Sequence, residues 1–118
     1  MGNRFKDLIV WQKAYQLTLS IYQVTESFPQ REQYGLTAQI RRAALSVPAN
    51  IAEGHERRSR KEYVQFLSIA KGSLGELETF LLLSKDLGFL PDNKFEATEA
   101  QCHEVSRLLH GLIRALEK

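Results

Sequence analysis

The stretch SRKEYVQFLSIAKGSLGELETFLLLSKDL, residues 59–87, has the clearest periodicity in the chain. Apolar and small residues recur along it at alternating spacings of three and four, which is the spacing of one face of an α-helix. The main stripe is Tyr63, Phe66, Ala70, Ser73, Leu77, Phe80, Ser84 and Leu87, and Leu67, Leu74 and Leu81 form a second stripe beside it. The pattern predicts an amphipathic helix about 42 Å long at 1.5 Å per residue.

Both ends of this predicted helix carry boundary signals. Ser59 with Glu62 three residues later is the capping-box pattern of a helix start. At the other end, Gly88 is expected to end the helix, with Phe89 folding back on the last turn as in a Schellman motif.

A second helix is predicted just before this one, from about Tyr34 to Gly54. Its apolar stripe is Leu36, Ile40, Ala43, Ala44, Val47 and Ile51. Pro48 lies inside it, where a proline lacks the backbone donor and clashes with the carbonyl of Ala44. The helix either kinks at Pro48 or ends at Leu45 and restarts, and we expect the kink because the stripe keeps its phase. Gly54 is expected to be the left-handed C-cap.

Two more amphipathic helices flank this pair. The first spans about Leu8–Ser27, with Asp7 as its expected N-cap and with Pro29 disfavouring helical backbone before it. Its stripe is Val10, Ala14, Leu17, Ile21, Val24 and Phe28. The last begins after Leu90-Pro91-Asp92, and its stripe keeps a heptad repeat through Thr98, Cys102, Val105, Leu109, Leu112 and Leu116.

Length and composition fit one domain covering residues 1–118. The chain has 16 Lys and Arg against 14 Asp and Glu, and 43% of its residues are apolar, as in an ordinary soluble domain. Because no strand pattern competes, we predict an all-α protein, an antiparallel up-down-up-down four-helix bundle with its second helix kinked at Pro48. The apolar runs Phe80–Leu83 and Leu8–Trp11 are far shorter than a membrane span of about 20 residues. Met1–Lys6 has no apolar leader pattern, so we expect a cytoplasmic protein without membrane contact.

Charge is distributed unevenly along the chain. Residues 1–72 hold eleven Lys and Arg against six Asp and Glu, a net charge of +5, whereas residues 73–118 hold five against eight, a net charge of −3. This segregation predicts a basic surface for an anionic partner on a molecule that is almost neutral overall.

The candidate phosphate contacts are basic residues of the second helix and of the connection after it. They are Arg41, Arg42, Arg57, Arg58, Arg60 and Lys61. Arginine forks suit bidentate contacts with phosphate. The alternative is a solvated surface whose charge Glu53, Glu56 and Glu62 offset through salt bridges. No RNA-recognition or helix-turn-helix signature is present, so we expect no strong sequence preference.

Catalytic, cofactor and metal sites lack a sequence signature. A ferritin-like metal site needs Glu-x-x-His pairs, but the residues three before His55, His103 and His110 are Ala52, Ala100 and Arg107. Glu99 and His103 are expected to be a solvated helix pair. The only cysteine, Cys102, lies on a core stripe, and its neighbour His103 points about 100° away around the helix. We therefore predict a non-enzymatic protein with no metal and no cofactor.

The first and third predicted helices carry more apolar residues than a four-helix core requires. Those off the main stripes are Trp11, Tyr15, Tyr22, Leu82 and Leu83. Exposed apolar patches mark partner surfaces, so we expect self-association; the alternative is deeper burial in a tight bundle. Gly72 and Gly75 each cost about 1 kcal/mol relative to alanine inside a helix. That cost predicts a close approach, against the second helix or a neighbouring subunit.

Four stretches together resemble one known family. They are FKDLIVWQKA (residues 5–14), Phe28-Pro29 followed by YGLTAQIRRAA (34–44), SVPANIAEG (46–54) and FLSIAKGSLGELE (66–78). This combination, in which SVPANIAEG is specific, resembles the bacterial four-helix-bundle family of 23S rRNA intervening-sequence proteins. The resemblance covers nearly the whole chain and implies a cytosolic bundle that assembles as a homopentameric ring. A related branch, the accessory protein of diversity-generating retroelements, binds nucleic acid and its partner reverse transcriptase through a basic surface.

The segment SVPANIAEG contains the structural motif Pro48, Asn50, Glu53 and Gly54. Asn50 and Glu53 lie three residues apart and share a helix face. We expect them to bond the carbonyl that Pro48 frees or the start of a neighbouring helix; a binding site is the alternative.

Two functions from different classes are consistent with these patterns. The first is a homo-oligomer that binds RNA or DNA through basic patches repeated in every subunit, so that weak phosphate contacts gain avidity. The second is a protein-binding adaptor or scaffold with no nucleic-acid role, in which a helix groove holds another polypeptide.

Overall fold

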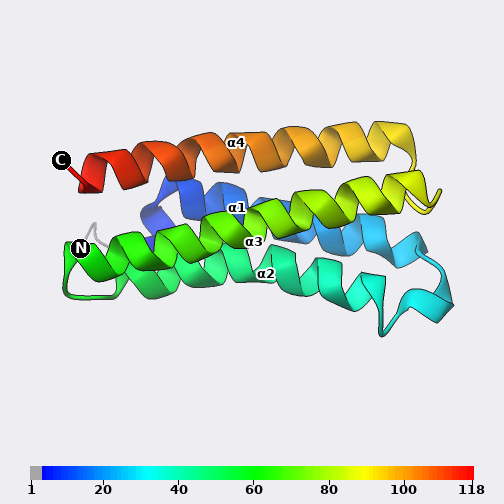
Figure 1. Cartoon of the computed structure of the whole chain (residues 1–118), viewed down its shortest axis with the longest axis horizontal. Helices are drawn as coiled ribbons and strands as arrows, with labels where there is room; N and C mark the ends of the chain where they lie inside the picture. Colours follow the sequence, from blue (N-terminus) through cyan, green and yellow to red (C-terminus); the bar gives the residue numbers. More distant parts are fainter. Residues whose placement is uncertain (1–3) are drawn as a thin grey trace.

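The computed structural model describes residues 4–118, which form a four-helix bundle and contain no strand. The α-helices are α1 (Ile9–Val24), α2 (Leu36–His55), α3 (Arg60–Asp86) and α4 (Asp92–Leu116), and three short 3-10 helices are η1 (Phe5–Asp7), η2 (Thr25–Ser27) and η3 (Gln30–Glu32). In Figure 1 the chain runs along α1, returns along α2, runs out again along α3 and returns along α4. The predicted all-α four-helix bundle is confirmed. None of the helices in this part of the chain is long and apolar enough to span a membrane.

The core lies between the four helices, each of which contacts both of its neighbours around the bundle. On α3 the buried positions are Leu67, Ala70, Leu74, Leu77, Leu81 and Ser84. The stripe predicted as secondary is therefore the deeper one, whereas Phe66 and Phe80 are only partly buried. The reason is that α3 packs between two helices, with Ser73 facing α2 and Glu78 facing α4, so its core line falls between the two stripes.

The two ends of α3 form as the sequence predicts. The Ser59 hydroxyl accepts a hydrogen bond of 3.1 Å from the backbone N–H of Glu62. Gly88 has a φ of 82°, and the N–H groups of Gly88 and Phe89 donate to the carbonyls of Lys85 and Ser84 at 2.9 Å each. This pair of bonds is a Schellman motif.

Two other cap predictions are wrong. Asp7 does not cap α1, because residues 5–7 form η1 and Leu8 occupies the N-cap position without a side-chain bond. Gly54 is not a left-handed cap, because α2 continues through it to His55 and its φ is not positive. Gly54 instead allows close packing, since a Cβ there would lie 2.8 Å from Phe66 Cβ.

Pro48 is accommodated inside a continuous α2, so the alternative in which the helix ends at Leu45 is wrong. The carbonyl of Ala44, which Pro48 deprives of its usual N–H donor, lies 3.1 Å from Thr18 Oγ1 of α1. The same hydroxyl lies 2.9 Å from the Ala14 carbonyl. The single Thr18 hydroxyl proton is shared between these two carbonyls, so a side chain of a neighbouring helix offers a donor to the freed carbonyl. The kink at Pro48 stays a prediction.

Apolar side chains are exposed on two faces that flank α2. The α1–α2 face contains Tyr15, Leu19, Tyr22 and Leu45. The α3 face follows the helical repeat through Ile69, Gly72, Glu76, Phe80, Leu83 and Leu87, of which Phe80 is partly buried. Leu82 is also exposed and Trp11 is partly buried, so deeper burial within one chain is wrong for all of the predicted surplus residues except Trp11.

The predicted close approach of α2 to Gly72 and Gly75 is wrong. A Cβ added at either glycine would meet nothing within 4 Å in the described chain. The space is open because both residues lie on the outer side of α3, away from its buried positions. The approach of a neighbouring subunit stays a prediction.

Candidate nucleic-acid interface

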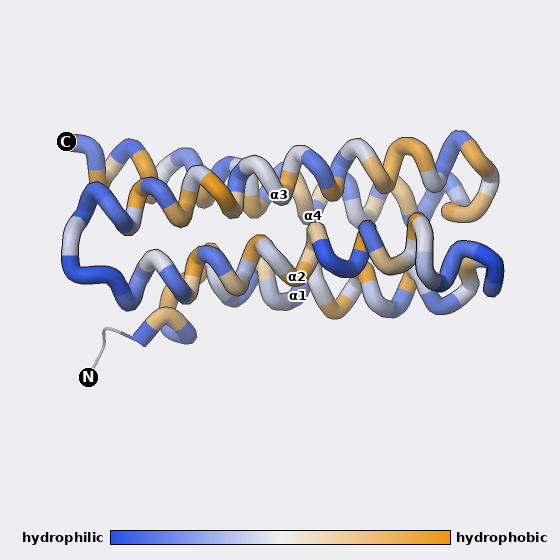
Figure 2. Tube along the Cα trace, turned by 60° about the horizontal axis from the view of Figure 1, so that its bottom comes forward, coloured by the Kyte–Doolittle hydropathy of each residue, from blue (hydrophilic) through white to orange (hydrophobic). Residues whose placement is uncertain are grey.

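The six basic residues predicted as phosphate contacts lie in two separate groups. Arg57, Arg58, Arg60 and Lys61 are all exposed at the α2–α3 connection, which Figure 2 shows as a hydrophilic end of the bundle. Arg41 and Arg42 lie further back on α2. At 1.5 Å per residue, Arg41 is about 21 Å along the helix from His55, the last residue of α2. The structure does not bring all six together.

The basic connection keeps three cations without an acidic partner. Arg57 contacts the carboxylate of Glu53 one turn earlier, and its guanidinium lies 4.8 Å from the centroid of the Phe66 ring. Glu56 instead lies 3.4 Å from His55, and Glu62 contacts Ser59 at the α3 cap. Within residues 4–118, Arg58, Arg60 and Lys61 form no ion pair; the complete set of pairs is Lys13–Glu104, His55–Glu56, Arg57–Glu53 and His103–Glu78.

An open groove of about 670 Å³ adjoins these cations. It lies between the start of α3 and the end of α4 and is lined by Arg60, Lys61, Val64, Gln65, Leu116, Glu117 and Lys118. Arg60 Nη1 lies 3.5 Å from the backbone oxygen of Lys118, so the arginine links the two helices. Val64 and Leu116 supply apolar surface, Arg60, Lys61 and Lys118 supply positive charge, and the carboxylate of Glu117 offsets part of that charge. We call this feature the α3–α4 groove.

Sequence reasoning missed the part of this groove that α4 contributes. Leu116 and Lys118 are more than 50 residues from Arg60 along the chain, and no motif links them. Only the predicted topology could have indicated this contact, because an antiparallel bundle places the end of the fourth helix beside the start of the third.

Arg41 has a structural role at the C-terminal end of α1, far from the basic α2–α3 connection. Its Nε donates to Thr25 Oγ1 at 2.9 Å, and its guanidinium lies 4.7 Å from the centroid of the Tyr22 ring. The adjoining hollow of about 410 Å³ also contains Glu26. Glu32 Oε1 accepts a long bond of 3.4 Å from the Leu36 N–H, so a carboxylate already lies at the start of α2. Arg42 is exposed on the outer side of the helix.

The residues of SVPANIAEG hold α2 against its neighbours. Asn50 Nδ2 donates to the Ser46 carbonyl at 2.8 Å, and Ser46 Oγ lies 2.8 Å from Ser73 Oγ of α3. The expectation that Asn50 or Glu53 bonds the carbonyl freed by Pro48 is wrong, because Thr18 lies beside that carbonyl and Glu53 pairs with Arg57. The local contacts of Asn50 are structural.

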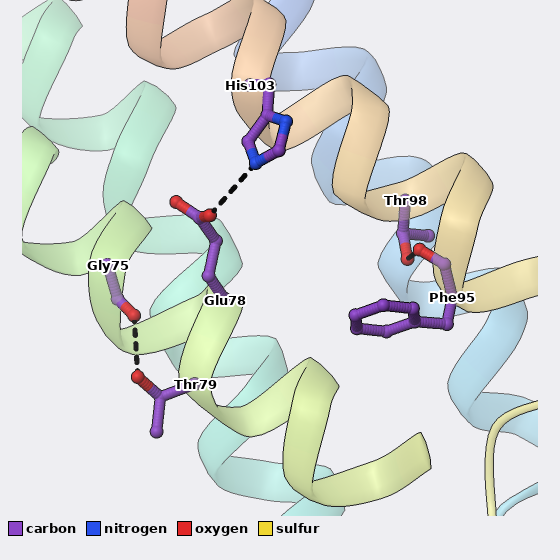
Figure 3. A network of polar contacts seen from close by, with 6 residues as sticks. All are labelled: Gly75, Glu78, Thr79, Phe95, Thr98 and His103. Atoms are coloured by element: carbon purple, nitrogen blue, oxygen red, sulfur yellow. Dashed lines mark hydrogen bonds and ion pairs between the residues drawn. The ribbon is translucent and has the colours of Figure 1, made fainter. Parts of the chain in front are cut away.

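Cys102, the only cysteine, lies on α4 next to a contact with α3. Glu78 of α3 points toward His103 of α4, with 3.6 Å between Oε1 and Nε2 (Figure 3). Burial raises the pKa of the Cys102 thiol to about 12, and the carboxylates of Glu78 and Glu99 add to the rise. A thiol that stays protonated is a poor nucleophile.

The described residues contain no group of three or more His, Cys, Asp or Glu placed to hold a metal ion.

Comparisons with known proteins agree with this architecture. Among solved structures, a protein with unknown function from the S23 ribosomal protein family of Bacteroides thetaiotaomicron matches with a TM-score of 0.83 at 23% identity, over 90% of this chain and 96% of that one. At this identity the likeness shows the fold alone. A search of curated proteins found no significant match. A family model described as 23S rRNA-intervening sequence protein matches residues 6–111. Because that match covers most of its length, the chain belongs to the family of 23S rRNA-intervening sequence proteins.

Proposed function

We propose that this chain is a non-enzymatic, self-assembling four-helix bundle of the cytoplasm that binds the phosphate backbone of RNA or DNA at its basic end, without strong sequence preference. One observation carries the proposal: Arg58, Arg60 and Lys61 are exposed together and lack an acidic partner in residues 4–118. Arg60 Nη1 lies 3.5 Å from the Lys118 backbone oxygen, which leaves its other N–H groups free of that contact. Together with Arg58 and Lys61 it is therefore available for charge-assisted bonds to phosphate. Arg57 extends this surface, although it also contacts Glu53.

Self-assembly is supported by the two exposed apolar faces. The α1–α2 face and the α3 face consist of different residues. If the α1–α2 face of one copy packs on the α3 face of the next, the contact is heterologous, and repeating it closes a ring when the rotation between copies permits. Arg41 and Arg42 lie beside the first face and Glu76 lies in the second, which gives the two faces complementary charge. A ring of five copies is what the family resemblance implies. Assembly multiplies the basic end and raises the apparent affinity for a long strand.

A salt titration tests the phosphate contact. The triple variant Arg58→Gln, Arg60→Gln, Lys61→Gln is expected to bind RNA and DNA more weakly at low salt. It is also expected to show a shallower dependence of log K on log salt, by about 0.7 to 0.9 for each phosphate that the variant no longer neutralises. Fluorescence anisotropy with labelled oligonucleotides, at salt concentrations between about 50 and 200 mM, measures both quantities.

The matched control removes three other exposed cations. Lys71→Gln, Lys94→Gln, Arg107→Gln changes the net charge equally but leaves the basic end intact. Equal reductions in affinity for the two triple variants would contradict a localised site. Absence of binding by the natural chain even at low salt would rule out the nucleic-acid function.

The exposed apolar faces also fit the second candidate, a protein-binding adaptor. That function predicts that the chain co-purifies from its native host with a defined polypeptide and without nucleic acid. An excess of absorbance at 260 nm that nuclease treatment removes would favour the first function instead.

A further inference from the structure

We infer that the α3–α4 groove holds one unpaired nucleotide, so that the basic end prefers single-stranded to double-stranded nucleic acid. This inference rests on the proposed function and specifies the form of its ligand.

The groove combines two kinds of surface in one place. Its volume is about 670 Å³, and it is open to solvent. Val64 and Leu116 are partly buried and face this space from different helices. Three cations, Arg60, Lys61 and Lys118, and one carboxylate, Glu117, adjoin the same space, so its net charge is positive. The apolar surface fits the face of a base, and the cations fit the phosphate attached to it.

Only an unpaired strand can use both surfaces. In a duplex the base faces are stacked inside the helix, so the groove would meet phosphate and sugar alone. A single strand can turn a base outward and place its face on a protein surface. Gln65 also lines the groove, and its amide offers a donor and an acceptor that any base edge can use. This arrangement predicts a preference for strand form with little preference for sequence.

Tyr34 is the competing site for an unpaired base. Its side chain is 90% exposed in the connection between α1 and α2, and exposed aromatic rings stack bases. We favour the groove because Arg60, Lys61 and Lys118 lie around it, whereas Tyr34 lies at the opposite end of the bundle from the basic connection.

The experiment compares one labelled RNA of mixed sequence as a single strand and annealed to its complement. Binding to the full chain is measured by anisotropy at low salt. The natural chain is expected to bind the single strand more tightly. Val64→Thr, which keeps the side-chain shape, and Leu116→Ser are each expected to weaken single-strand binding about fivefold and to leave duplex binding unchanged. Tyr34→Ser is the matched control and is expected to change neither.

Circular dichroism first establishes that each variant is folded; Val64→Thr serves as the test if Leu116→Ser unfolds. Equal affinity for the two forms, or equal weakening for both in the groove variants, would overturn the groove site but leave phosphate binding in place. Disappearance of the single-strand preference in Tyr34→Ser alone would assign the base contact to Tyr34. Absence of binding to either form would overturn the proposed function itself.

Discussion

Thr18 of α1 and Pro48 of α2 both affect one backbone group, the carbonyl of Ala44. Pro48 leaves the Ala44 carbonyl without its helical donor, and the Thr18 hydroxyl lies 3.1 Å from that carbonyl. Both side chains are buried, so no water replaces the missing donor freely. A proline inside α2 is therefore tolerated through a residue 30 positions earlier in the chain.

This pair predicts an energetic coupling. Thr18→Val is expected to lower the free energy of unfolding by about 1–3 kcal/mol, because it leaves a buried carbonyl unpaired. In the Pro48→Ala background the backbone N–H is restored, so the same substitution is expected to cost less. Urea denaturation of the two single variants and the double variant measures the coupling. Equal costs of Thr18→Val in both backgrounds would show that the hydroxyl does not compensate for the proline.

Cys102 predicts a decrease in stability in alkali. Burial raises its pKa to about 12 in the folded chain, from an ordinary value of 9.0. The thiol then contributes stability that is fully present below about pH 9 and is lost as the pH rises toward 12, because the unfolded chain releases the proton first. Urea midpoints of the natural chain and of Cys102→Ala are expected to converge across this range. Parallel curves would contradict the assigned pKa.

At the scale of elements, the α2–α3 pair is organised around one glycine and a short polar network. Gly54 brings α3 so close that a Cβ would lie 3.1 Å from Tyr63 Cδ1 as well as 2.8 Å from Phe66 Cβ. Asn50 lies one turn before Gly54 on α2, and Ser46 lies two turns before it. The Asn50 side-chain amide donates a hydrogen bond to the Ser46 hydroxyl, which in turn contacts the Ser73 hydroxyl of α3. Close packing at one end and polar contacts in the middle set how the two helices sit together.

Gly54 and Gly111 form a matched test of this packing. Gly54→Ala is expected to destabilise the chain by about 1–3 kcal/mol through overpacking against α3. Gly111 lies inside α4, and a Cβ there would meet nothing within 4 Å. Gly111→Ala is therefore expected to stabilise the chain by about 0.5–1 kcal/mol through helix propensity. Thermal denaturation compares the two, and a stabilising Gly54→Ala would contradict the close approach.

At the scale of the whole molecule, the outer surface around α2 is more apolar than a solitary bundle requires. Leu19 and Leu45 on the α1–α2 face are 49% and 52% exposed, and Ile69 on the α3 face is 51% exposed. Gly72 lies on the same α3 face with open space around it, and in the proposed assembly a helix of a second copy fills that space. The proposed assembly therefore uses both faces of every subunit.

Variants of single faces test this arrangement. Leu19→Glu blocks one face and Leu83→Glu the other, so each variant alone is expected to run by light scattering as a monomer of 13.5 kDa. Mixing them leaves one intact face on each partner, so a heterologous contact yields dimers that cannot close a ring. Ile9→Glu, an equally exposed position outside both faces, is expected to keep the natural mass. A natural chain that is monomeric at micromolar concentration would contradict self-assembly.

Local pattern predicted most of the helices and only part of the site. The α3 boundaries followed from Ser59, Glu62 and Gly88, because caps depend on contacts within a few residues. The start of α1 near Leu8 was predicted to within one residue, but its N-cap was wrong because a 3-10 turn at residues 5–7 competes with capping by Asp7. Arg57 to Lys61 were found as a cluster because they are adjacent in sequence, whereas Arg41 contacts α1.

The sequence alone determined the helical class, the four elements and the charge of the α2–α3 connection, since helical period and charge are properties of neighbouring residues. Tertiary structure decided which residue satisfies the Ala44 carbonyl, which glycine permits close packing, and which side chains of α4 complete the groove beside Arg60. Each of these depends on how far apart two helices lie and how each is rotated about its axis. Those quantities are set by packing of the whole core, and no local stretch of sequence encodes them.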